Sequence, residues 1–382
     1  MIPLTKPYIP ESTYGKIVDV MGSSHLQGGG PFSLMSEYRL FEIVGNGKVK
    51  LAPSCTSALD LASLLIDLRE GDEVIIPSFN FPSAALSVVN YGAIPIFVDI
   101  EEKTKCIMVE QIEEQITSKT RAISWVNYAG YAPDVDALRR ISQKYGLFLI
   151  EDNAHALGSS SRGVKLGSQG DFAVYSFHAT KNLQCGEGGA IQINNRKFWN
   201  QVEYMVEKGT NRFDYESGAI NKYTWVEKGG SFLNSEILST ILFDQLELFD
   251  QIQQKRRYIY NTYLQEFKEF TQSLGFSGSF EEVDEEHAAH LFFLEFNNLE
   301  QRNLFISAMH SFEITTAFHY QALHNSAGGK KFGRDSGFLN NSIRAAQNLV
   351  RLPIYYDLEN SQLEWIIECA KKVIKKLAAS KQ

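Results

Sequence analysis

The sequence predicts an α/β protein with a mainly parallel central sheet, because short apolar segments alternate with helix-like segments after the first 50 residues or so. Segments 73–78 and 94–100 are almost wholly apolar and rich in β-branched residues, as strands buried on both faces are. Segment 57–68 has apolar residues at helical spacing, and segment 134–146 reads as an amphipathic helix ended by glycine. Segment 147–152 then reads as a strand that ends on charged residues. This alternation is typical of a sheet with helices on both faces.

The length of the chain predicts two domains. It has 382 residues, more than one hydrophobic core usually needs. Helical text over 235–267 leads into a part in which strand-like and helix-like segments read as a smaller α+β unit. We therefore expect a large α/β domain over 1–250, whose N-terminal segment can pack elsewhere, and a small C-terminal domain over 251–382. Surface or capping roles are expected for three histidines of the small domain, His287, His290 and His310.

Composition and charge are those of an ordinary soluble globular protein. The net charge of −8 argues against nucleic acid as the main partner, because phosphate binding needs a basic face. No run reaches the roughly 18 apolar residues of a membrane-spanning helix, and the N-terminus lacks the apolar region of a secretory signal. The four cysteines, Cys55, Cys106, Cys185 and Cys369, lie far apart and show no zinc spacing. We expect a cytoplasmic protein with reduced thiols, no metal site and no membrane partner.

Residues 173–194 place a lysine between a strand-like segment and a run of glycines. The apolar segment 173–177 precedes Lys181, and the Gly-Glu-Gly-Gly segment 186–189 lets backbones approach closely. A lone lysine is usually a surface charge, but a lysine in a partly desolvated site has a lowered pKa and can be a neutral nucleophile. Its natural covalent chemistry is an imine with a carbonyl group. Lys181 is therefore the candidate catalytic residue.

Four short polar or aromatic segments fit the remaining parts of pyridoxal 5′-phosphate. Asp152 is either a loop or cap carboxylate or the anion that keeps a pyridine nitrogen protonated. Thr56 and Ser57 begin an apolar helix, as an ordinary N-cap or as a phosphate site to which Ser176 could add a hydroxyl. Phe81 is either core or a lid stacked on a flat ring. Together with the lysine, these groups predict pyridoxal 5′-phosphate as the cofactor.

Polar residues also follow three strand-like segments. Asp152, Ser176 and Asn127 each stand where a strand is expected to end. In parallel sheets, ligands bind beyond the carboxyl ends of the strands. The three residues converge only if their strands are neighbours in the sheet.

The chain resembles the sugar-nucleotide aminotransferases of the DegT/DnrJ group, which are fold-type I pyridoxal-phosphate enzymes. The similarity runs from "MIPLTKP" to "RLPIYY", and its most specific segments include "LIEDNAHALGSS", "YSFHATKN" and "KYTWVEKGGSFLNSE". The resemblance implies a large domain with a central mixed, mostly parallel seven-stranded sheet and a smaller C-terminal α+β domain. It also implies a homodimer whose active sites lie at the interface.

By position, the resemblance implies a role for each residue of the cofactor site. Lys181 would form an imine with the cofactor and then move protons to and from the sugar carbon. Asp152 would contact the ring nitrogen, and Phe81 would stack on the ring. His155 would lie near the ring hydroxyl, where relatives often have glutamine. The phosphate would be held by Thr56, Ser57 and Ser176.

The resemblance further implies residues at the substrate mouth. His319 and Tyr320, in the "FHY" segment, would form part of that mouth, and Lys222 and Trp225 would serve it too. The diphosphate of a nucleotide sugar needs a basic partner, for which Arg212 is a candidate.

The chain departs from the family pattern at several positions. Two of these departures favour one reaction over others, and one leaves open which residue reaches the partner's phosphate site. Many relatives place an asparagine in the loop that reaches the partner's phosphate site, whereas here Leu233 aligns and Asn234 stands beside it. Relatives with histidine in place of Lys181 are dehydratases, so the lysine argues against that activity. Relatives that aminate C3 tend to have Tyr-Pro before the lysine, whereas this chain reads "FHATKN", which favours C4.

The expected reaction transfers an amino group from L-glutamate to C4 of dTDP-4-dehydro-6-deoxyglucose. The product would be a dTDP-4-amino-4,6-dideoxyhexose for surface polysaccharides such as the O-antigen of lipopolysaccharide. A C3 aminotransferase and an enzyme of UDP-linked sugars are the alternatives within the family. A cofactor-binding regulator without activity would be expected to lose Lys181 or Asp152, and both are present. A plain dinucleotide-binding domain would need a GxGxxG segment, which "PSCTSA" does not supply.

Overall fold

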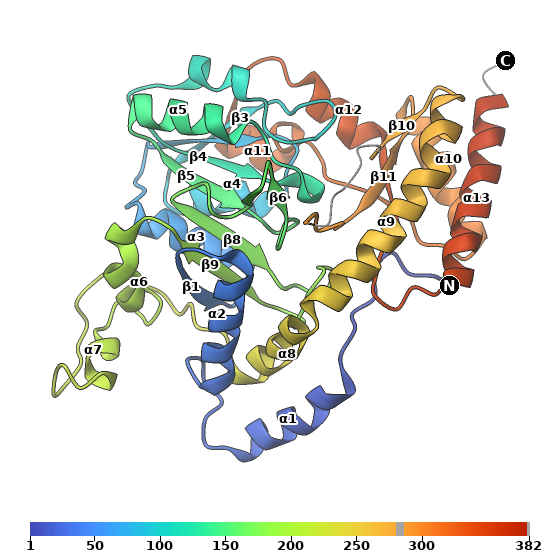
Figure 1. Cartoon of the computed structure of the whole chain (residues 1–382). Helices are drawn as coiled ribbons and strands as arrows, with labels where there is room; N and C mark the ends of the chain where they lie inside the picture. Colours follow the sequence, from blue (N-terminus) through green and yellow to red (C-terminus); the bar gives the residue numbers. More distant parts are fainter. Residues whose placement is uncertain (280–285, 380–382) are drawn as a thin grey trace.

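The computed structural model describes residues 1–279 and 286–379. A large sheet with helices on both faces lies beside a smaller sheet covered by long helices (Figure 1). The helices are α1 (Glu11–Gly22), α2 (Pro31–Val44), α3 (Cys55–Leu65), α4 (Pro82–Val89), α5 (Val135–Tyr145), α6 (Trp199–Met205), α7 (Arg212–Glu216), α8 (Glu236–Glu247), α9 (Phe249–Gln272), α10 (Leu299–Ser311), α11 (Ala327–Phe332), α12 (Asn340–Asn348) and α13 (Asn360–Ala379). The strands are β1 (Lys48–Ala52), β2 (Glu73–Pro77), β3 (Ile94–Val98), β4 (Thr120–Val126), β5 (Phe148–Asp152), β6 (Ser160–Ser161), β7 (Val164–Lys165), β8 (Phe172–Ser176), β9 (Gly189–Ile193), β10 (Ser277–Gly278), β11 (Phe292–Glu295), β12 (Ala317–Phe318), β13 (Arg334–Asp335) and β14 (Leu349–Leu352).

The large sheet is mixed and mostly parallel, as expected. Its order is β1-β9-β8-β5-β4-β2-β3-β13. From β8 to β13 each neighbouring pair is parallel, whereas β9 is antiparallel to both β1 and β8. The resemblance implied seven strands, and the structure has an eighth. This strand, β13, has two residues, comes from the C-terminal part of the chain and pairs with the exposed edge of β3.

The central strands are apolar throughout because both of their faces are covered. In β2, Val74 and Ile76 pack in a cluster with α3, whereas Ile75 packs on the opposite face in a cluster with α5. In β8, Phe172 faces the α3 side, and Tyr175 faces a cluster built from α2 and α8. The absence of polar alternation in the sequence therefore reflects burial on both faces.

Helix α5 begins at a capping side chain and ends at a glycine, as its sequence predicts. The side chain of Asp134 caps α5 by accepting a hydrogen bond from the backbone N–H of Ala137 at 3.0 Å. Gly146 ends the same helix with φ of 69°, a conformation that favours glycine. The expected helix over this segment is confirmed.

The smaller sheet and its helices form a second layered unit. Its strand order is β10-β11-β14-β12, and one core cluster joins it to α9, α10 and α13. A separate cluster, which includes Phe79, Tyr128 and Phe293, fills the seam between the two sheets. We propose that the two units divide near residue 250, between α8 and α9. The N-terminus lies with the second unit, since Ile2 forms a β-bridge with Ile314.

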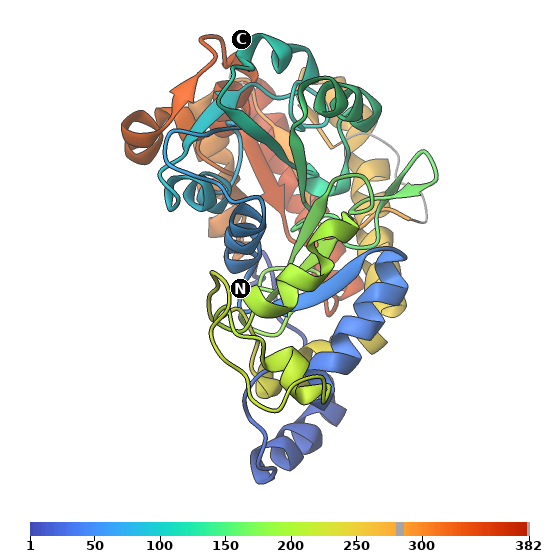
Figure 2. The ribbon, with the colours of Figure 1, turned by 90° about the vertical axis from the view of Figure 1, so that its left-hand side faces the viewer.

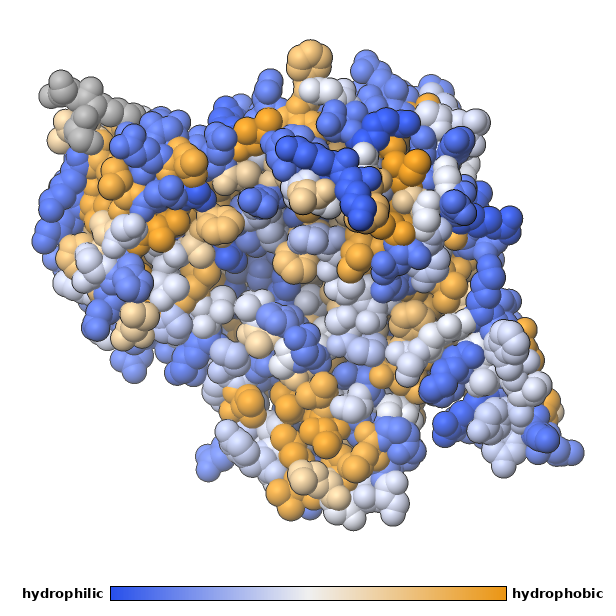
Figure 3. Space-filling model, turned by 180° about the vertical axis from the view of Figure 1, so that it is seen from behind, coloured by the Kyte–Doolittle hydropathy of each residue, from blue (hydrophilic) through white to orange (hydrophobic). Residues whose placement is uncertain are grey.

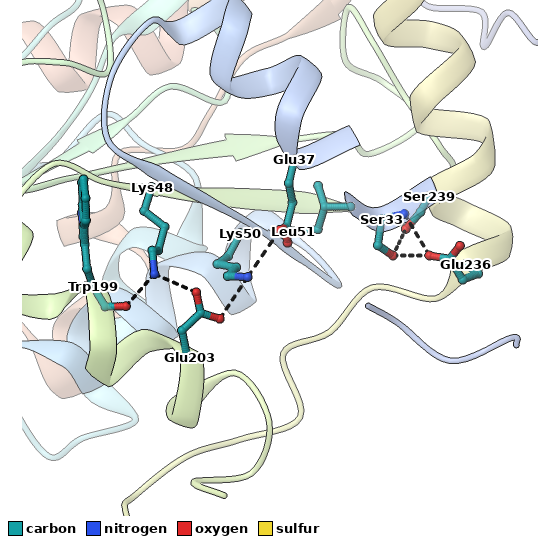
Figure 4. A network of polar contacts seen from close by, with 9 residues as sticks. All are labelled: Ser33, Glu37, Lys48, Lys50, Leu51, Trp199, Glu203, Glu236 and Ser239. Atoms are coloured by element: carbon teal, nitrogen blue, oxygen red, sulfur yellow. Dashed lines mark hydrogen bonds and ion pairs between the residues drawn. The ribbon is translucent and has the colours of Figure 1, made fainter. Parts of the chain in front are cut away.

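Polar contacts fix α2 against α8 and β1 (Figure 4). The buried carboxylate of Glu236, in α8, accepts hydrogen bonds from the backbone N–H groups of Phe32 and Ser33 at 2.9 Å each. These groups belong to the first turn of α2, where helix amides lack partners within the helix. Beside them, Lys50 pairs with Glu37 at 3.4 Å and with Glu203 at 3.0 Å.

Helix α1 lies at the end of the molecule opposite the C-terminus, and α2 lies between α1 and the large sheet (Figure 2). All four cysteines are free, and burial raises the pKa of the Cys106 and Cys185 thiols to about 12. In the ranges 1–279 and 286–379, no helix has both the length and the apolar composition needed to cross a bilayer.

Candidate active site

A cavity of about 1180 Å³ opens where the carboxyl ends of β4, β5 and β8 face the smaller sheet. These three strands are neighbours, so the residues that follow them converge. Asp152 and Ser176 line the cavity. Asn127 does not; its amide instead donates to the side-chain oxygen of Asn153 at 2.7 Å in the core. The expected convergence is therefore found for two of the three strand ends.

Lys181 lies in the segment between β8 and β9, and its side chain lines the cavity. The pKa of its amine is lowered to about 8, chiefly by burial and to a smaller extent by the positive charge of Arg351. The carboxylate of Asp152 and the Cys55 thiol act in the opposite direction. A considerable fraction of the amine is therefore neutral near physiological pH, as a nucleophile or proton acceptor requires.

Asp152 is buried at the end of β5. Its Oδ1 accepts a hydrogen bond from the backbone N–H of Ala154 at 2.9 Å. Burial raises the pKa of this carboxyl, whereas the Ala154 hydrogen bond and the charge of Lys181 lower it. Its Oδ2 has no hydrogen-bond partner within the described part of the chain, which leaves one carboxylate oxygen free for a cationic group in the cavity.

The start of α3 forms a polar wall of the cavity. Ser54 is the N-cap residue and accepts a hydrogen bond from the backbone N–H of Ser57 at 3.0 Å. The hydroxyl of Thr56 lies 2.7 Å from that of Ser83. Cys55 and Thr56 line the cavity, whereas Ser57 does not. Ser57 therefore lies in the expected turn, but its backbone N–H group is already hydrogen-bonded to the N-cap residue Ser54.

Gly189 explains why glycines follow the lysine. A Cβ atom at this position would lie 2.3 Å from the carbonyl carbon of Ser54. Only glycine lets β9 approach the first turn of α3 this closely. The glycine-rich segment thus brings the lysine loop against the polar wall.

His155 and Tyr320 form a hydrogen-bonded pair beside the lysine. The Nδ1 atom of His155 accepts from the backbone N–H of Ala129 at 3.4 Å, so its Nε2 atom carries the proton of the neutral ring. Burial keeps this ring neutral by lowering its pKa. The Nε2–H group then donates to the Tyr320 hydroxyl at 3.1 Å. The proton of that hydroxyl remains available to a ligand.

His319 and Phe81 lie on either side of Tyr320. The Nδ1 atom of His319 is 2.8 Å from the Tyr128 hydroxyl. The Phe81 side chain is 55% exposed at the cavity mouth, and its ring centroid is 6.1 Å from that of Tyr320. Both line the cavity.

His290 corrects an expectation drawn from the sequence. The residue is buried and lines the cavity rather than lying at the surface. Its ring stacks on that of His155 with a centroid distance of 4.2 Å. His287 is also buried, and burial lowers its pKa to about 4. His310, in the last turn of α10, is exposed as expected.

The tautomer of His290 follows from a chain of hydrogen bonds. The Gln253 amide donates to the carbonyl of Leu157 at 3.3 Å, so its Oε1 accepts from the Asn182 amide at 3.0 Å. That amide also donates to the carbonyl of Ala288 at 2.7 Å. The Oδ1 atom of Asn182 must therefore accept the proton of His290 Nδ1, at 2.8 Å. The Nε2 atom of His290 is left as an acceptor.

Three of the expected substrate residues lie on a segment that projects from the large sheet (Figure 1). This segment, residues 207–231, is called the arm here; β-bridges join Glu207 to Ser231 and Thr210 to Trp225. Trp225 is 76% exposed, and Arg212 pairs with Glu216 at 2.8 Å. None of these three residues, Arg212, Lys222 and Trp225, lines the cavity of its own chain.

Asn234 does not line the cavity either. The residue is buried, and its amide donates to the Ser239 hydroxyl at 3.3 Å. A Cβ atom at Gly28 would lie 2.3 Å from the Asn234 carbonyl oxygen, so the loop before α2 packs tightly over it. The position of Asn234 is therefore set by the loop before α2 and by the start of α8.

The described groups fit pyridoxal 5′-phosphate. Lys181 presents an amine that is partly neutral, and Asp152 has a free carboxylate oxygen, which suits a protonated ring nitrogen. The backbone N–H groups of Cys55 and Thr56 begin a helix and have no acceptor among the described residues, which suits a phosphate. Ser176 adds a hydroxyl on the same side of the cavity.

Two residues of the cavity were missed from the sequence. Arg351 and His290 both line it. Arg351 lies in the "RLPIYY" segment, the last segment of the resemblance, and His290 is the first residue of the strand-like segment "HLFFLEF". For His290, the available signal was a polar residue at the start of an expected strand, whereas no strand was expected around Arg351.

Comparison with known proteins agrees with this geometry. The model of the DegT/DnrJ/EryC1/StrS aminotransferase family matches residues 7–371. Uncharacterized protein MJ1066 of Methanocaldococcus jannaschii is 30% identical over 380 residues, which are 98% of this chain and 97% of that protein. Spore coat polysaccharide biosynthesis protein SpsC of Bacillus subtilis is 28% identical, with the same shares covered.

Solved structures show the same fold. The putative sugar aminotransferase Spr1654 of Streptococcus pneumoniae, in its PMP form, superposes with a TM-score of 0.89 at 26% identity. The match covers 99% of this chain and 100% of that one, and Spr1654 is also known in a PLP form. The chain therefore belongs to the DegT/DnrJ/EryC1/StrS aminotransferase family, and its cofactor is pyridoxal 5′-phosphate.

Proposed function

We propose that the protein transfers the amino group of L-glutamate to C4 of dTDP-4-dehydro-6-deoxyglucose. The observation that carries an amination reaction is the placement of Lys181 and Asp152 in one cavity, with the amine of Lys181 partly neutral. A sugar substrate is supported by two relatives, whose names are those of a putative sugar aminotransferase and a polysaccharide biosynthesis protein. The "FHATKN" segment before the lysine favours C4 over C3.

Each residue has a definite task in this proposal. When bound, the cofactor supplies an aldehyde that takes up the amino group and a ring that withdraws electrons. Lys181 accepts and returns a proton at its Nζ atom, and Asp152 holds the positive charge of the ring nitrogen. The first turn of α3 at Cys55 and Thr56, together with Ser176, orients the phosphate. Tyr320 donates its hydroxyl proton to a ligand oxygen, in an orientation set by His155.

The cavity leaves room for a large second substrate. Its volume of about 1180 Å³ is more than the cofactor and an amino acid require, since pockets for drug-sized ligands span roughly 300–1,000 Å³. The exposed Phe81 and the buried His319 both line it. A nucleotide sugar, with its sugar at Lys181 and its nucleotide toward the mouth, uses this space.

We further propose a homodimer with the active sites at its interface. Apolar side chains gather over the lobe that contains α1 (Figure 3). Tyr14, Val18 and Met21 of α1 are each more than 60% exposed. A cluster of this kind on a water-soluble domain is typical of a buried interface. In the dimer, the arm that carries Arg212, Lys222 and Trp225 would complete the cavity of the partner.

Product analysis tests this function. Purified protein with pyridoxal 5′-phosphate, L-glutamate and dTDP-4-dehydro-6-deoxyglucose should give a dTDP-4-amino-4,6-dideoxyhexose, identified by NMR. The same experiment determines whether the amine is axial or equatorial. An amine at C3, or turnover with only UDP-linked ketosugars, would replace the proposal with an alternative reaction. Stoichiometric cofactor without turnover of any ketosugar would indicate a regulator.

A further inference from the structure

Arg351 brings a second cation into the cavity. The residue lies in β14, in register with Phe293 of β11 and with Ala317 of β12. Its half-buried side chain lines the cavity on the side of the smaller sheet, across from the lysine loop. Its charge is close enough to Lys181 to affect the protonation of that amine.

The guanidinium of Arg351 lacks the partners that a buried charge normally has. Its Nη2 atom donates to the carbonyl of Phe318 at a long 3.4 Å. Its Nε atom is buried and has no acceptor within the described part of the chain. Arg256, which is also buried near the seam, instead donates to the carbonyls of Ala289, Ile354 and His290. Because a half-buried charge without an anionic partner is costly, Arg351 is suited to an anion that the described part of the chain does not supply.

Among the residues that the structure describes, the ionisable side chains that act on the charge of Arg351 are two phenols and no carboxylate. Its neighbours Tyr128 and Tyr320 are phenols whose pKa values burial raises, so both are neutral. His319 is a neutral ring, since burial lowers its pKa. Two carboxylates also line the cavity. Asp152 faces the cofactor ring in the proposed function, and Glu187 is exposed and lies 3.7 Å from His178.

Geometry decides which anion this guanidinium binds. An α-amino acid carries its carboxylate on the same carbon as the amino group, so the carboxylate must lie near the reacting nitrogen and near Lys181. The diphosphate of a nucleotide sugar is separated from C4 by the sugar ring and lies toward the mouth. A guanidinium also matches the two oxygens of a carboxylate with paired hydrogen bonds. We infer that Arg351 binds the α-carboxylate of the amino-acid donor.

This inference deepens the proposed transamination and rests on it. The ketosugar has no carboxylate at its reacting centre, so Arg351 should serve the amino-acid half-reaction alone. The two half-reactions share Lys181, but they should differ in their need for the guanidinium. That difference separates Arg351 from a residue that merely maintains the fold.

The test measures the two half-reactions separately by the absorbance of the bound cofactor. Arg351→Gln should lower kcat/KM for L-glutamate by about 100-fold or more, because it removes a charge-paired contact. The reaction of the pyridoxamine form with dTDP-4-dehydro-6-deoxyglucose should change by less than about threefold, within ordinary context effects. Arg351→Lys should recover part of the loss by keeping the charge. Arg344→Gln removes an exposed arginine that pairs with Glu102, and it should match the wild type in both half-reactions.

A second probe is independent of overall fold. The amine 4-aminobutyrate is L-glutamate without its α-carboxylate, so the wild type should strongly prefer L-glutamate. Arg351→Gln should abolish most of that preference by lowering only the L-glutamate rate. Equal losses in both half-reactions, a loss confined to the ketosugar, or an unchanged preference would overturn the inference. If the wild type reacts with no amino acid at all, the proposed function fails instead.

Discussion

The rings of His155 and His290 stack with centroids 4.2 Å apart and an interplanar angle of 26°. Both rings are buried and neutral, because burial lowers their pKa values. His290 also donates a hydrogen bond to the side chain of Asn182, the residue after Lys181. The stack therefore connects the smaller sheet to the lysine loop, and it fixes the face of the cavity that His155 presents.

The first prediction concerns this stack. His290→Phe keeps an aromatic ring but leaves the Asn182 oxygen without its donor. We expect unfolding free energy to fall by about 1–3 kcal/mol, the usual cost of a buried unsatisfied polar group. Turnover should fall as well, because the loop that holds Lys181 loses an anchor. Denaturant melts and steady-state rates give both values. His310→Phe alters an exposed histidine and should change neither; equal behaviour of the two variants would count against the stack.

Substitution of the lysine tests its role as proton carrier. Lys181→Ala should reduce amination by at least about 1,000-fold, in the upper range for a general acid–base group. The variant should still bind the cofactor, because the polar turn at Thr56 and the carboxylate of Asp152 remain. Equilibrium dialysis and product assays measure the two effects. Lys103→Ala, at an exposed lysine, serves as the control. Residual amination near the wild-type rate would show that another group moves the proton.

The pH dependence of cofactor uptake follows from the lowered pKa. A lysine whose pKa is about 8 gains its neutral, nucleophilic form as pH rises through 8. Uptake of pyridoxal 5′-phosphate by the apoprotein should therefore level off above pH 8, whereas an ordinary lysine would require about pH 10. Because Asp152 raises this pKa, Asp152→Asn should move the midpoint to lower pH. Stopped-flow absorbance from pH 6 to 10 measures the profile, and a midpoint near 10 would contradict the burial of Lys181.

Glu236 supplies a test of stability away from the cavity. Glu236→Ala removes the acceptor for the first amides of α2. We expect a loss of about 2 kcal/mol, the upper end for a helix cap. Thermal or urea unfolding provides the value. Glu247→Ala, at an exposed carboxylate that pairs with Arg39, should change stability by less than about 1 kcal/mol.

Residues at strand ends could be predicted from the sequence, and residues placed by long-range packing could not. Lys181, Asp152 and Ser176 follow apolar segments, so the sequence predicts that they lie at the edge of the sheet. His290 read as a surface residue because nothing local shows that the smaller sheet folds over β5. Arg351 was missed for the same reason. The strand β13 was also unexpected, since two residues carry no strand pattern and pairing with β3 depends on tertiary contact.

The arm shows a second limit of prediction from a single sequence. Arg212, Lys222 and Trp225 were expected at the substrate mouth, and none of them lines the cavity of its own chain. Their placement in the proposed function depends on a second copy of the chain. No pattern within a single sequence specifies which copy a residue serves.

The central claim, that the Lys181 amine bonds to the cofactor, is tested most directly by borohydride reduction and peptide mass spectrometry. The protein loaded with pyridoxal 5′-phosphate should carry the added mass of the reduced cofactor on the peptide that contains Lys181. Attachment to a different lysine would contradict the claim, as would a protein that stays colourless and unmodified after the cofactor is added.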